Sequence, residues 1–269
     1  MHQIRQPAVA GTFYPGAPVT LAQDVNDLLA AAHPAPLSKL PKAVIVPHAG
    51  YIYSGAIAAA AYASIAAGRD RITRVVLLGP VHRVPVRGLA LPGVDAFATP
   101  LGNIPIDQAA VELLGTMPQI VTSAAAHTWE HSLEVQLPFL QAVLNDFSLI
   151  PLAVGDATPE EIAEVLEVLW GGPETLIVIS SDLSHFLPYP TAQAVDRQTA
   201  QHILELRGPL THEQACGGTP INGMLLAARR HHLQPLLLDL RNSGDTAGDK
   251  DRVVGYASFA FMEETTDAH

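Results

Sequence analysis

The sequence predicts a single α/β domain over residues 1–269, in which strands and helices alternate along the chain. Three short runs rich in Val, Ile and Leu have the length and composition of buried strands, at 43–47, 74–79 and 175–180. Hydrophobic residues make up 48% of the chain and charged residues only 15%, so the chain can bury a large core.

Two helices are expected in the N-terminal third. Apolar residues at helical spacing predict the first, at Leu21, Val25, Leu28 and Leu29. The second follows the strand at 43–47, is rich in alanine, is expected to be capped by Ser54 and ends at Gly68. Its apolar stretch from Ala56 to Ala67 is shorter than the roughly 18 residues of a membrane-spanning segment, so we expect a buried helix.

The middle of the chain has weaker signals. Two short extended segments are expected near 86–91 and 94–98. Asp107 is the expected N-cap of a helix that ends at Leu114. Leucines along one stripe of 128–140 predict another helix, which Pro138 is expected to disturb.

The C-terminal half continues the alternation. A strand at 148–154 precedes a helix whose first turn, Thr158-Pro-Glu-Glu161, has the cap, the proline and the glutamate typical of a helix start. The later elements are a helix over 191–206, a helix from Thr219 to about His231, and strands near 235–240 and 253–262.

Charge and composition limit the partners and the compartment. The formal net charge is −11 and Lys and Arg form no cluster, which argues against a nucleic-acid partner. The N-terminus lacks the apolar core of a signal peptide and no apolar stretch is long enough to span a membrane, so no membrane partner is expected. A single cysteine fits a reducing, cytoplasmic location.

Each of the three apolar runs leads into a loop that carries a histidine, namely His48, His82 or His185. Ligands of α/β sheets gather beyond the carboxyl ends of the strands, so we expect these side chains to meet there. Imidazole is a common metal ligand and proton carrier, and His48 and His82 are candidate ligands. His185, which Asp182 could orient, suits general acid–base chemistry, with a ligand or structural role as the alternatives.

The only cysteine, Cys216, lies directly before the helix that Thr219 opens. A thiolate near a helix N-terminus is stabilised by the helix dipole, which should lower the pKa of this thiol. Two histidines and a cysteine with an open position are compatible with iron, copper or zinc. A buried structural cysteine and a Cys–His nucleophile pair remain as alternatives.

The segment around residue 130 carries a weaker metal-site signal. His127 and His131 are four residues apart, as in sites on one helix face, but a helix that starts at Thr128 would leave His127 outside it. We expect His131 to face the substrate or to support the ligands. Glu130 and Glu134 have the same spacing and also fit a solvated helix face.

At these motifs the chain resembles the MEMO family, the B component of the AmmeMemoRadiSam group. The matching stretches are Arg5–Tyr14, Pro47–Tyr51, Leu78–His82, Glu130–Glu134, Ser180–His185 and Cys216–Ile221. The family is similar in fold to the catalytic subunit of class III extradiol dioxygenases. The resemblance therefore implies a three-layer α/β sandwich with a central mixed sheet.

The resemblance also implies roles for the site residues. Those dioxygenases hold Fe(II) with two histidines and a carboxylate, and the histidines correspond to His48 and His82. The base-like histidine corresponds to His185, and His131 is another pocket histidine with a catalytic role. The family has cysteine, here Cys216, in place of the carboxylate, which argues against ring cleavage and implies iron or copper, with zinc as a further option.

Substrate-side residues follow from the same resemblance. The eukaryotic branch is associated with phosphotyrosine-peptide recognition, and the tryptophan of its Gly-Ser-Trp-Tyr motif is Phe13 here. Phe13, Tyr51 and Asp182 are the expected substrate-binding residues.

Three functions are consistent with these observations. The first is a metal-dependent oxidoreductase that acts on an unidentified small molecule or modified side chain. The second is a peptide- or partner-binding module of a modification system, with radical SAM and AMMECR1-like proteins as partners. The third is a Cys–His hydrolase, which would use Cys216 as its nucleophile.

Overall fold

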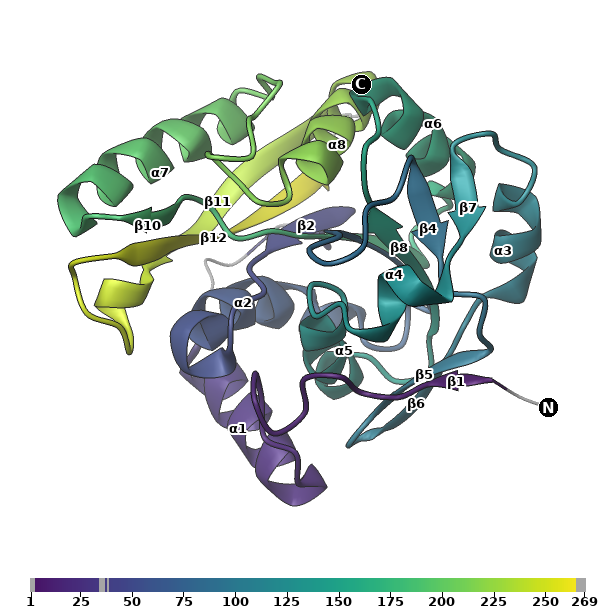
Figure 1. Cartoon of the computed structure of the whole chain (residues 1–269), viewed down its shortest axis with the longest axis horizontal. Helices are drawn as coiled ribbons and strands as arrows, with labels where there is room; N and C mark the ends of the chain where they lie inside the picture. Colours follow the sequence, from purple (N-terminus) through teal and green to yellow (C-terminus); the bar gives the residue numbers. More distant parts are fainter. Residues whose placement is uncertain (1–2, 34–36, 38, 265–269) are drawn as a thin grey trace.

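The computed structural model describes residues 3–33, 37 and 39–264, and a mixed sheet forms its centre (Figure 1). Parallel strands make up the middle of the sheet, in the order β2 (Ala43–Val46), β9 (Thr175–Ser180), β3 (Arg74–Pro80) and β8 (Ser148–Val154). The flanking strands are β12 (Val253–Glu263), β10 (His185–Leu187) and β11 (Leu233–Asn242) beyond β2, and β4 (Leu89–Leu91) and β7 (Ile120–Thr122) beyond β8. Both β12 and β4 run antiparallel to the central strands.

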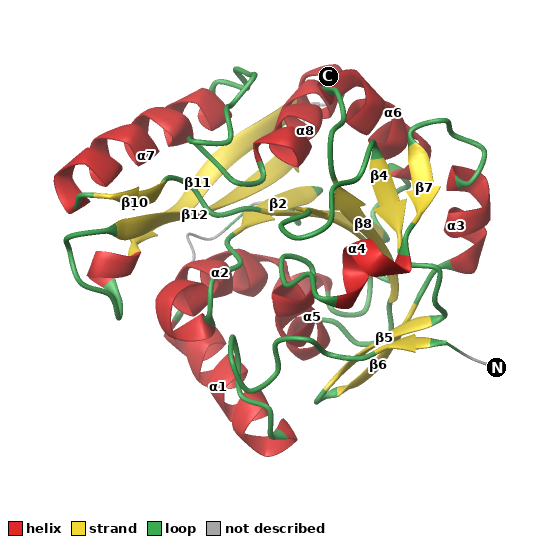
Figure 2. Ribbon diagram, viewed as in Figure 1, coloured by secondary structure: helices red, strands yellow, loops and turns green. Residues whose placement is uncertain are grey.

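Alternate side chains of the central strands enter two cores, one on each face of the sheet. Val44 and Val46 belong to one core, whereas Ala43 and Ile45 belong to the other. The first core is covered by α1 (Pro18–Ala31), α2 (Tyr51–Ile65), α4 (Ala124–Thr128) and α5 (Leu137–Val143). The second is covered by α3 (Gln108–Leu114), α6 (Pro159–Leu169), α7 (Tyr189–Leu204) and α8 (Gly218–Arg230). Helix, sheet and helix form the predicted three-layer α/β sandwich (Figure 2).

A small second sheet anchors the N-terminal segment. It contains, in spatial order, β1 (Ile4–Arg5), β5 (Ala96–Thr99) and β6 (Gly102–Pro105). After β1 the chain runs to the start of α2, where the Tyr51 amide donates a hydrogen bond to the Phe13 carbonyl at 2.8 Å. The N-terminal segment therefore reaches the carboxyl end of β2 and places Phe13 beside it.

The alanine-rich helix is a core helix, as predicted. Together with the 3-10 turn η1 (Ala66–Gly68), α2 forms a stretch, Tyr51–Gly68, that is apolar enough by composition to cross a membrane. In the folded protein 61% of that stretch is buried. Its small side chains let α2 pack closely against the sheet and α1 (Figure 1).

Two helix starts agree with the sequence prediction in detail. The Asp107 side chain accepts a hydrogen bond from the Ala110 amide and caps α3. Thr158 and Glu161 form a complete capping box at the start of α6. The other predicted strands, and the predicted helices outside 128–140, begin and end within a few residues of their predicted bounds, whereas β1, β6, β7, β10 and α4 have no predicted counterpart.

Two other expectations about helices are wrong. Ser54 does not cap α2, because the helix already begins at Tyr51 and the Ser54 hydroxyl donates to the Ala49 carbonyl. Pro138 does not disturb a helix over 128–140, because that segment is a loop and a 3-10 turn, η2 (Glu134–Gln136), before α5. Pro138 lies in the first turn of α5, where its missing N–H has no helical partner to lose.

Candidate metal centre

Three histidines from separate parts of the chain meet at the carboxyl edge of the sheet. His48 follows β2, His82 follows β3 and His131 lies in the loop after α4. One ring nitrogen of each lies within 4.8 Å of the corresponding nitrogens of the other two. The parallel direction of β2 and β3 explains why His48 and His82 share this edge, as predicted.

His48 is the buried member of the group, with 2% of its surface exposed. Its backbone amide donates to Asp182 Oδ1 at 2.7 Å, and its ring Nδ1 lies 2.9 Å from Ser180 Oγ. Burial lowers the pKa of His48 well below its usual value, and the neighbouring His131 and His82 lower it further. The ring is therefore a neutral imidazole, the form that binds metals.

His82 lies at the open side of the group and is oriented by a buried carboxylate. The ring Nδ1 is 2.8 Å from Glu130 Oε1, and the backbone amide donates to Glu130 Oε2 at 2.6 Å. Because a carboxylate only accepts hydrogen bonds, Nδ1 carries the proton and the Nε2 lone pair is free for a ligand. A carboxylate behind a histidine ligand is the usual arrangement in protein metal sites.

His131 completes the group. Its ring packs on His82 with 4.6 Å between ring centroids, and on the Phe13 ring at 4.8 Å. Burial and the neighbouring His82 lower the pKa of His131 to about 4, so this ring is also neutral. The sequence predicts a pocket histidine here, and the structure places one of its ring nitrogens within 4.8 Å of a ring nitrogen of each predicted histidine ligand.

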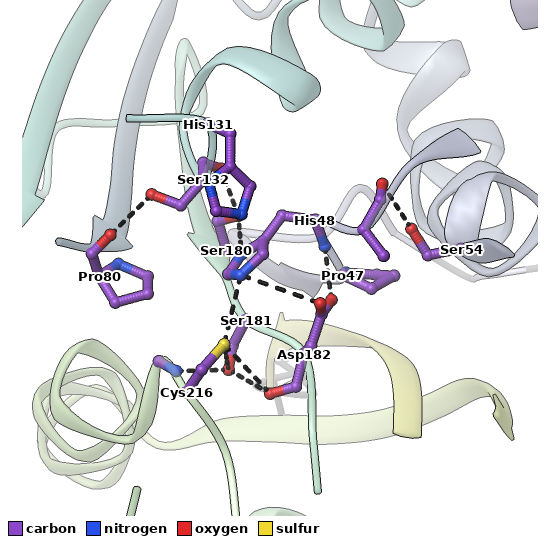
Figure 3. Close-up of polar contacts among 12 residues, drawn as sticks. Pro47, His48, Ser54, Pro80, His131, Ser132, Ser180, Ser181, Asp182 and Cys216 are labelled. Carbon is purple, nitrogen blue, oxygen red and sulfur yellow. Dashed lines mark hydrogen bonds and ion pairs between the residues drawn. The ribbon is translucent and has the colours of Figure 1, made fainter. Parts of the chain in front are cut away.

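Cys216 contacts the histidine group through His48. Its Sγ lies 3.3 Å from His48 Nε2 (Figure 3). Cys216 and His82 line the same cavity. The predicted lowering of its pKa is wrong for the metal-free protein: burial, with the nearby Asp182 charge, raises the pKa of the thiol to about 12. Loss of solvent around the thiol outweighs the dipole of α8.

Asp182 is turned toward His48 and not toward His185. Its Oδ2 lies 3.9 Å from His48 Nε2, while the ring Nδ1 of His185 lies 2.8 Å from the Leu183 carbonyl. The expectation that Asp182 orients His185 is therefore wrong, because Asp182 contacts His48 and the Leu183 carbonyl holds the His185 ring. Burial raises the pKa of Asp182 to about 7.

A cavity of about 910 Å³ opens beside the histidine group. His82, His185 and Cys216 line it, so three of the predicted site residues border one space. Apolar side chains form much of its wall, among them Val81, Val86, Val154 and Leu187. The volume is that of a typical small-molecule site.

The two predicted aromatic substrate residues occupy different positions. Phe13 is half-buried and its ring contacts His131. Tyr51 is buried at the start of α2, and its hydroxyl donates to the Val135 carbonyl at 2.7 Å. Tyr51 thus connects α2 to the segment that follows His131.

Other residues near position 130 differ from expectation. Glu130 and Glu134 are not a solvated face: both are buried, with 3% and 0% of their surface exposed. His127 lies in α4 and its ring contacts the Ala90 carbonyl, so it is not part of the histidine group. The supporting roles of Ser180 and Gln136 were not predicted, because a serine at the end of a predicted strand and a glutamine within a predicted helix do not by themselves indicate a contact with His48.

The residues present fit a bound metal ion. Imidazoles converge from three separate segments, and buried oxygens of Ser180 and Glu130 hold the outer nitrogens of His48 and His82. A thiol and a carboxyl lie within 4 Å of His48 Nε2. Such a set of nitrogen donors with a sulfur beside them suits iron, copper or zinc.

Fold and site together define a three-layer α/β protein with a candidate histidine metal centre at the strand ends. The family model of Memo-like proteins matches residues 5–260, and the chain belongs to this family. A MEMO1 family protein of Aquifex aeolicus is 36% identical over 272 residues, covering 97% of this chain and 100% of the relative.

One further relative and one solved structure are also similar to this chain. A MEMO1 family protein of Metallosphaera sedula is 34% identical over 285 residues, with 96% of this chain and 99% of the relative covered. The crystal structure of an uncharacterized protein from Escherichia coli K12 superposes with a TM-score of 0.53 at 16% identity. That match covers 82% of this chain and 99% of the other, and it shows a shared fold.

Proposed function

We propose that this protein is a metal-dependent oxidoreductase that uses the histidine group as its metal site. The observation that carries the proposal is the convergence of three imidazoles beside a thiol and a cavity of about 910 Å³. A metal ion with an open coordination position next to a substrate-sized cavity is the usual arrangement of a metalloenzyme.

The proposed ligands are His48, His82 and Cys216, and iron or copper is the expected metal, with zinc as the alternative. The metal would supply redox or Lewis-acid chemistry. His131 lies within ligand distance as well and competes with Cys216 for the third position. Metal binding would favour the thiolate of Cys216, whose pKa burial raises to about 12 in the metal-free protein.

The remaining site residues have roles on the substrate side. His185 borders the cavity with one ring nitrogen held by the Leu183 carbonyl, which leaves the other nitrogen for acid–base chemistry. In this proposal Asp182, Phe13 and Tyr51 bind the substrate and His131 takes part in catalysis. Phe13, whose ring packs on His131, and Tyr51 line a second cavity, of about 540 Å³. The substrate is a small molecule or a side chain of a peptide, and the protein acts in the cytoplasm, with radical SAM and AMMECR1-like proteins as partners.

Metal content tests this proposal. Protein purified without oxygen should contain about one metal ion per chain by elemental analysis. The ion should be lost when His48 and Cys216 are both replaced by alanine. A wild-type protein that binds no iron, copper or zinc, although it is folded, would contradict the proposal.

The third ligand is identified by comparing Cys216→Ser with His131→Ala. If Cys216 is the ligand, a Cu²⁺-loaded wild type should show a sulfur-to-metal absorption band that Cys216→Ser lacks and His131→Ala retains. The reverse dependence of metal content, with loss in His131→Ala only, would assign the position to His131.

One distance also supports a different function. Cys216 Sγ lies 3.3 Å from His48 Nε2, which is the geometry of a Cys–His nucleophile pair. The raised pKa of the thiol argues against it, because an activated cysteine needs a lowered pKa. Rapid labelling of Cys216 by iodoacetamide at neutral pH in metal-free protein, abolished in His48→Ala, would favour the hydrolase.

A further inference from the structure

Nδ1 of the His48 ring contacts the buried hydroxyl of Ser180, and this hydroxyl has three polar neighbours. Ser180 Oγ lies 2.6 Å from the Ser132 carbonyl and 2.9 Å from His48 Nδ1 (Figure 3). It also lies 2.8 Å from Gln136 Nε2. Ser180, Gln136 and His48 are each at most 2% exposed. Each hydrogen bond therefore forms away from water, and its direction can be assigned.

The single hydroxyl proton of Ser180 is already committed to one hydrogen bond. The Ser132 carbonyl can only accept, so Ser180 donates its single proton to that oxygen. Both lone pairs of Oγ then remain as acceptors, and the two other neighbours must donate to them.

The amide of Gln136 is oriented by two further contacts. Its Nε2 also lies 2.9 Å from the Pro47 carbonyl, which can only accept. Its Oε1 accepts a hydrogen bond from the Tyr62 hydroxyl at 2.8 Å. Gln136 therefore donates one proton to Pro47 and one to Ser180, and the last acceptor position on Ser180 belongs to His48 Nδ1–H.

We propose that Ser180, held by Gln136 and Tyr62, is a positioning residue that fixes the neutral tautomer of His48. With the proton on Nδ1, the Nε2 lone pair points to the side where Cys216 Sγ lies, at 3.3 Å. This inference rests on the proposed function for its consequence, since the fixed lone pair is the one that a metal would use.

The two ligand candidates are thus supported differently. His82 has the charged Glu130 carboxylate behind its Nδ1, whereas His48 has a neutral hydroxyl. A carboxylate raises the basicity of a histidine ligand, and a hydroxyl raises it less. Ser180 thus sets the orientation and tautomer of His48 without adding a negative charge to a site that already has Asp182 and Cys216 beside it.

Two measurements test the inference. Long-range ¹H–¹⁵N NMR spectra of the histidine rings report the tautomer directly, and metal-free wild type should show His48 protonated at Nδ1. Co²⁺ affinity, measured by competition with a chromophoric chelator, should fall roughly 10- to 100-fold in Ser180→Ala. Ser180→Thr retains the hydroxyl and should restore most of the affinity.

Thr199→Val is the matched control. Thr199 lies in α7, is equally buried, and its hydroxyl also donates a hydrogen bond to a backbone carbonyl, that of Val195 at 3.1 Å. The variant leaves Ser180 and its three partners unchanged, so its Co²⁺ affinity should stay close to wild type. Metal-free melting temperatures of the two variants show whether they are equally folded.

The possible results separate the inference from the proposed function. A wild-type His48 protonated at Nε2, or a Ser180→Ala variant that binds Co²⁺ as tightly as wild type, would overturn the role of Ser180. A wild type that binds no Co²⁺ or native metal would instead overturn the metal site. The NMR spectrum of the wild type would still decide the tautomer, including when Ser180→Ala fails to fold.

Discussion

Glu130 holds His82 by two hydrogen bonds, one from the backbone amide at 2.6 Å and one from the ring Nδ1 at 2.8 Å. The same carboxylate accepts the amides of His131 and Ser132, each at 2.9 Å. One buried side chain thus fixes the end of β3 and the loop that carries His131. Burial alone would raise the pKa of Glu130, but the hydrogen bonds from His82 and the backbone amides lower it to about 2.

Replacing this carboxylate should weaken metal binding. In Glu130→Gln the negative charge beside His82 Nδ1 is lost. The side-chain amide of the new glutamine also places an N–H group against one of the four N–H groups that donate to Glu130. We expect roughly 10- to 100-fold lower metal affinity, measured by chelator competition. Glu160→Gln, at an exposed position in the first turn of α6, is the control and should leave affinity unchanged. Equal affinity of the two variants would contradict this role.

A second buried carboxylate holds the N-terminal segment. Glu134, with 0% exposure, forms an ion pair with Arg5 and accepts hydrogen bonds from the Ala8 and Val9 amides and the Tyr14 hydroxyl. Glu134→Gln leaves the buried Arg5 without its counter-charge, which should lower the free energy of unfolding by about 3–5 kcal/mol. Urea denaturation measures this loss.

Tyr14→Phe is the comparison for that prediction. It removes one hydrogen bond to the carboxylate but keeps the ion pair, so it should cost only about 1.5–3 kcal/mol. If Glu134→Gln were no more destabilising than Tyr14→Phe, the ion pair with Arg5 would not be the main contribution.

Strand positions and two of the clustered histidines could be predicted from the sequence because both depend on local patterns. Apolar runs mark β2, β3 and β9, and parallel strands bring His48 and His82 to one edge. The positions of His131 and Glu130 depend instead on how the loop after α4 folds over that edge. No periodic pattern encodes such a loop, which is why a helix was expected there.

The polar side chains that hold the histidines in place could not be predicted from the sequence either. The contact of Ser180 with Gln136 joins residues 44 positions apart, and it depends on how the 3-10 turn η2 lies against the end of β9. The raised pKa of Cys216 has the same origin, since burial is a property of the folded chain. The helix start that follows Cys216 is visible in the sequence, but the loss of solvent that outweighs it is not.

Close packing of α6 and α8 gives a test of the second core. A Cβ on Gly223 of α8 would lie 2.2 Å from Cγ2 and 2.4 Å from Cβ of Ile162 on α6. Gly223→Ala gains about 1 kcal/mol of helix propensity but forces the helices apart at a cost of about 1–3 kcal/mol, so we expect net destabilisation. Gly115→Ala, where the nearest atom is 3.4 Å away, is the control for urea denaturation. A Gly223→Ala protein as stable as Gly115→Ala would contradict the packing argument.

His127 should make the stability of the protein depend on pH. The ring is buried, its Nε2 donates to the Ala90 carbonyl at 2.8 Å, and its Nδ1 has no hydrogen-bond partner among the described residues. A second proton would have to go on Nδ1, in a buried place near the Arg5 guanidinium. Burial chiefly, and Arg5 in addition, lower the pKa of His127 to about 4, against opposing effects of the Ala90 carbonyl and Glu130.

The sign of the effect follows from the lowered pKa. The unfolded chain takes up this proton near pH 6.5 and the folded chain only near pH 4, so the contribution of His127 is intact above pH 6.5. It is lost as the pH falls from 6.5 to 4, by up to about 3 kcal/mol. His127→Gln can keep the bond to Ala90 but cannot take up a proton. Urea denaturation at several pH values should therefore show wild type losing stability relative to His127→Gln across this range, and a constant difference would contradict the prediction.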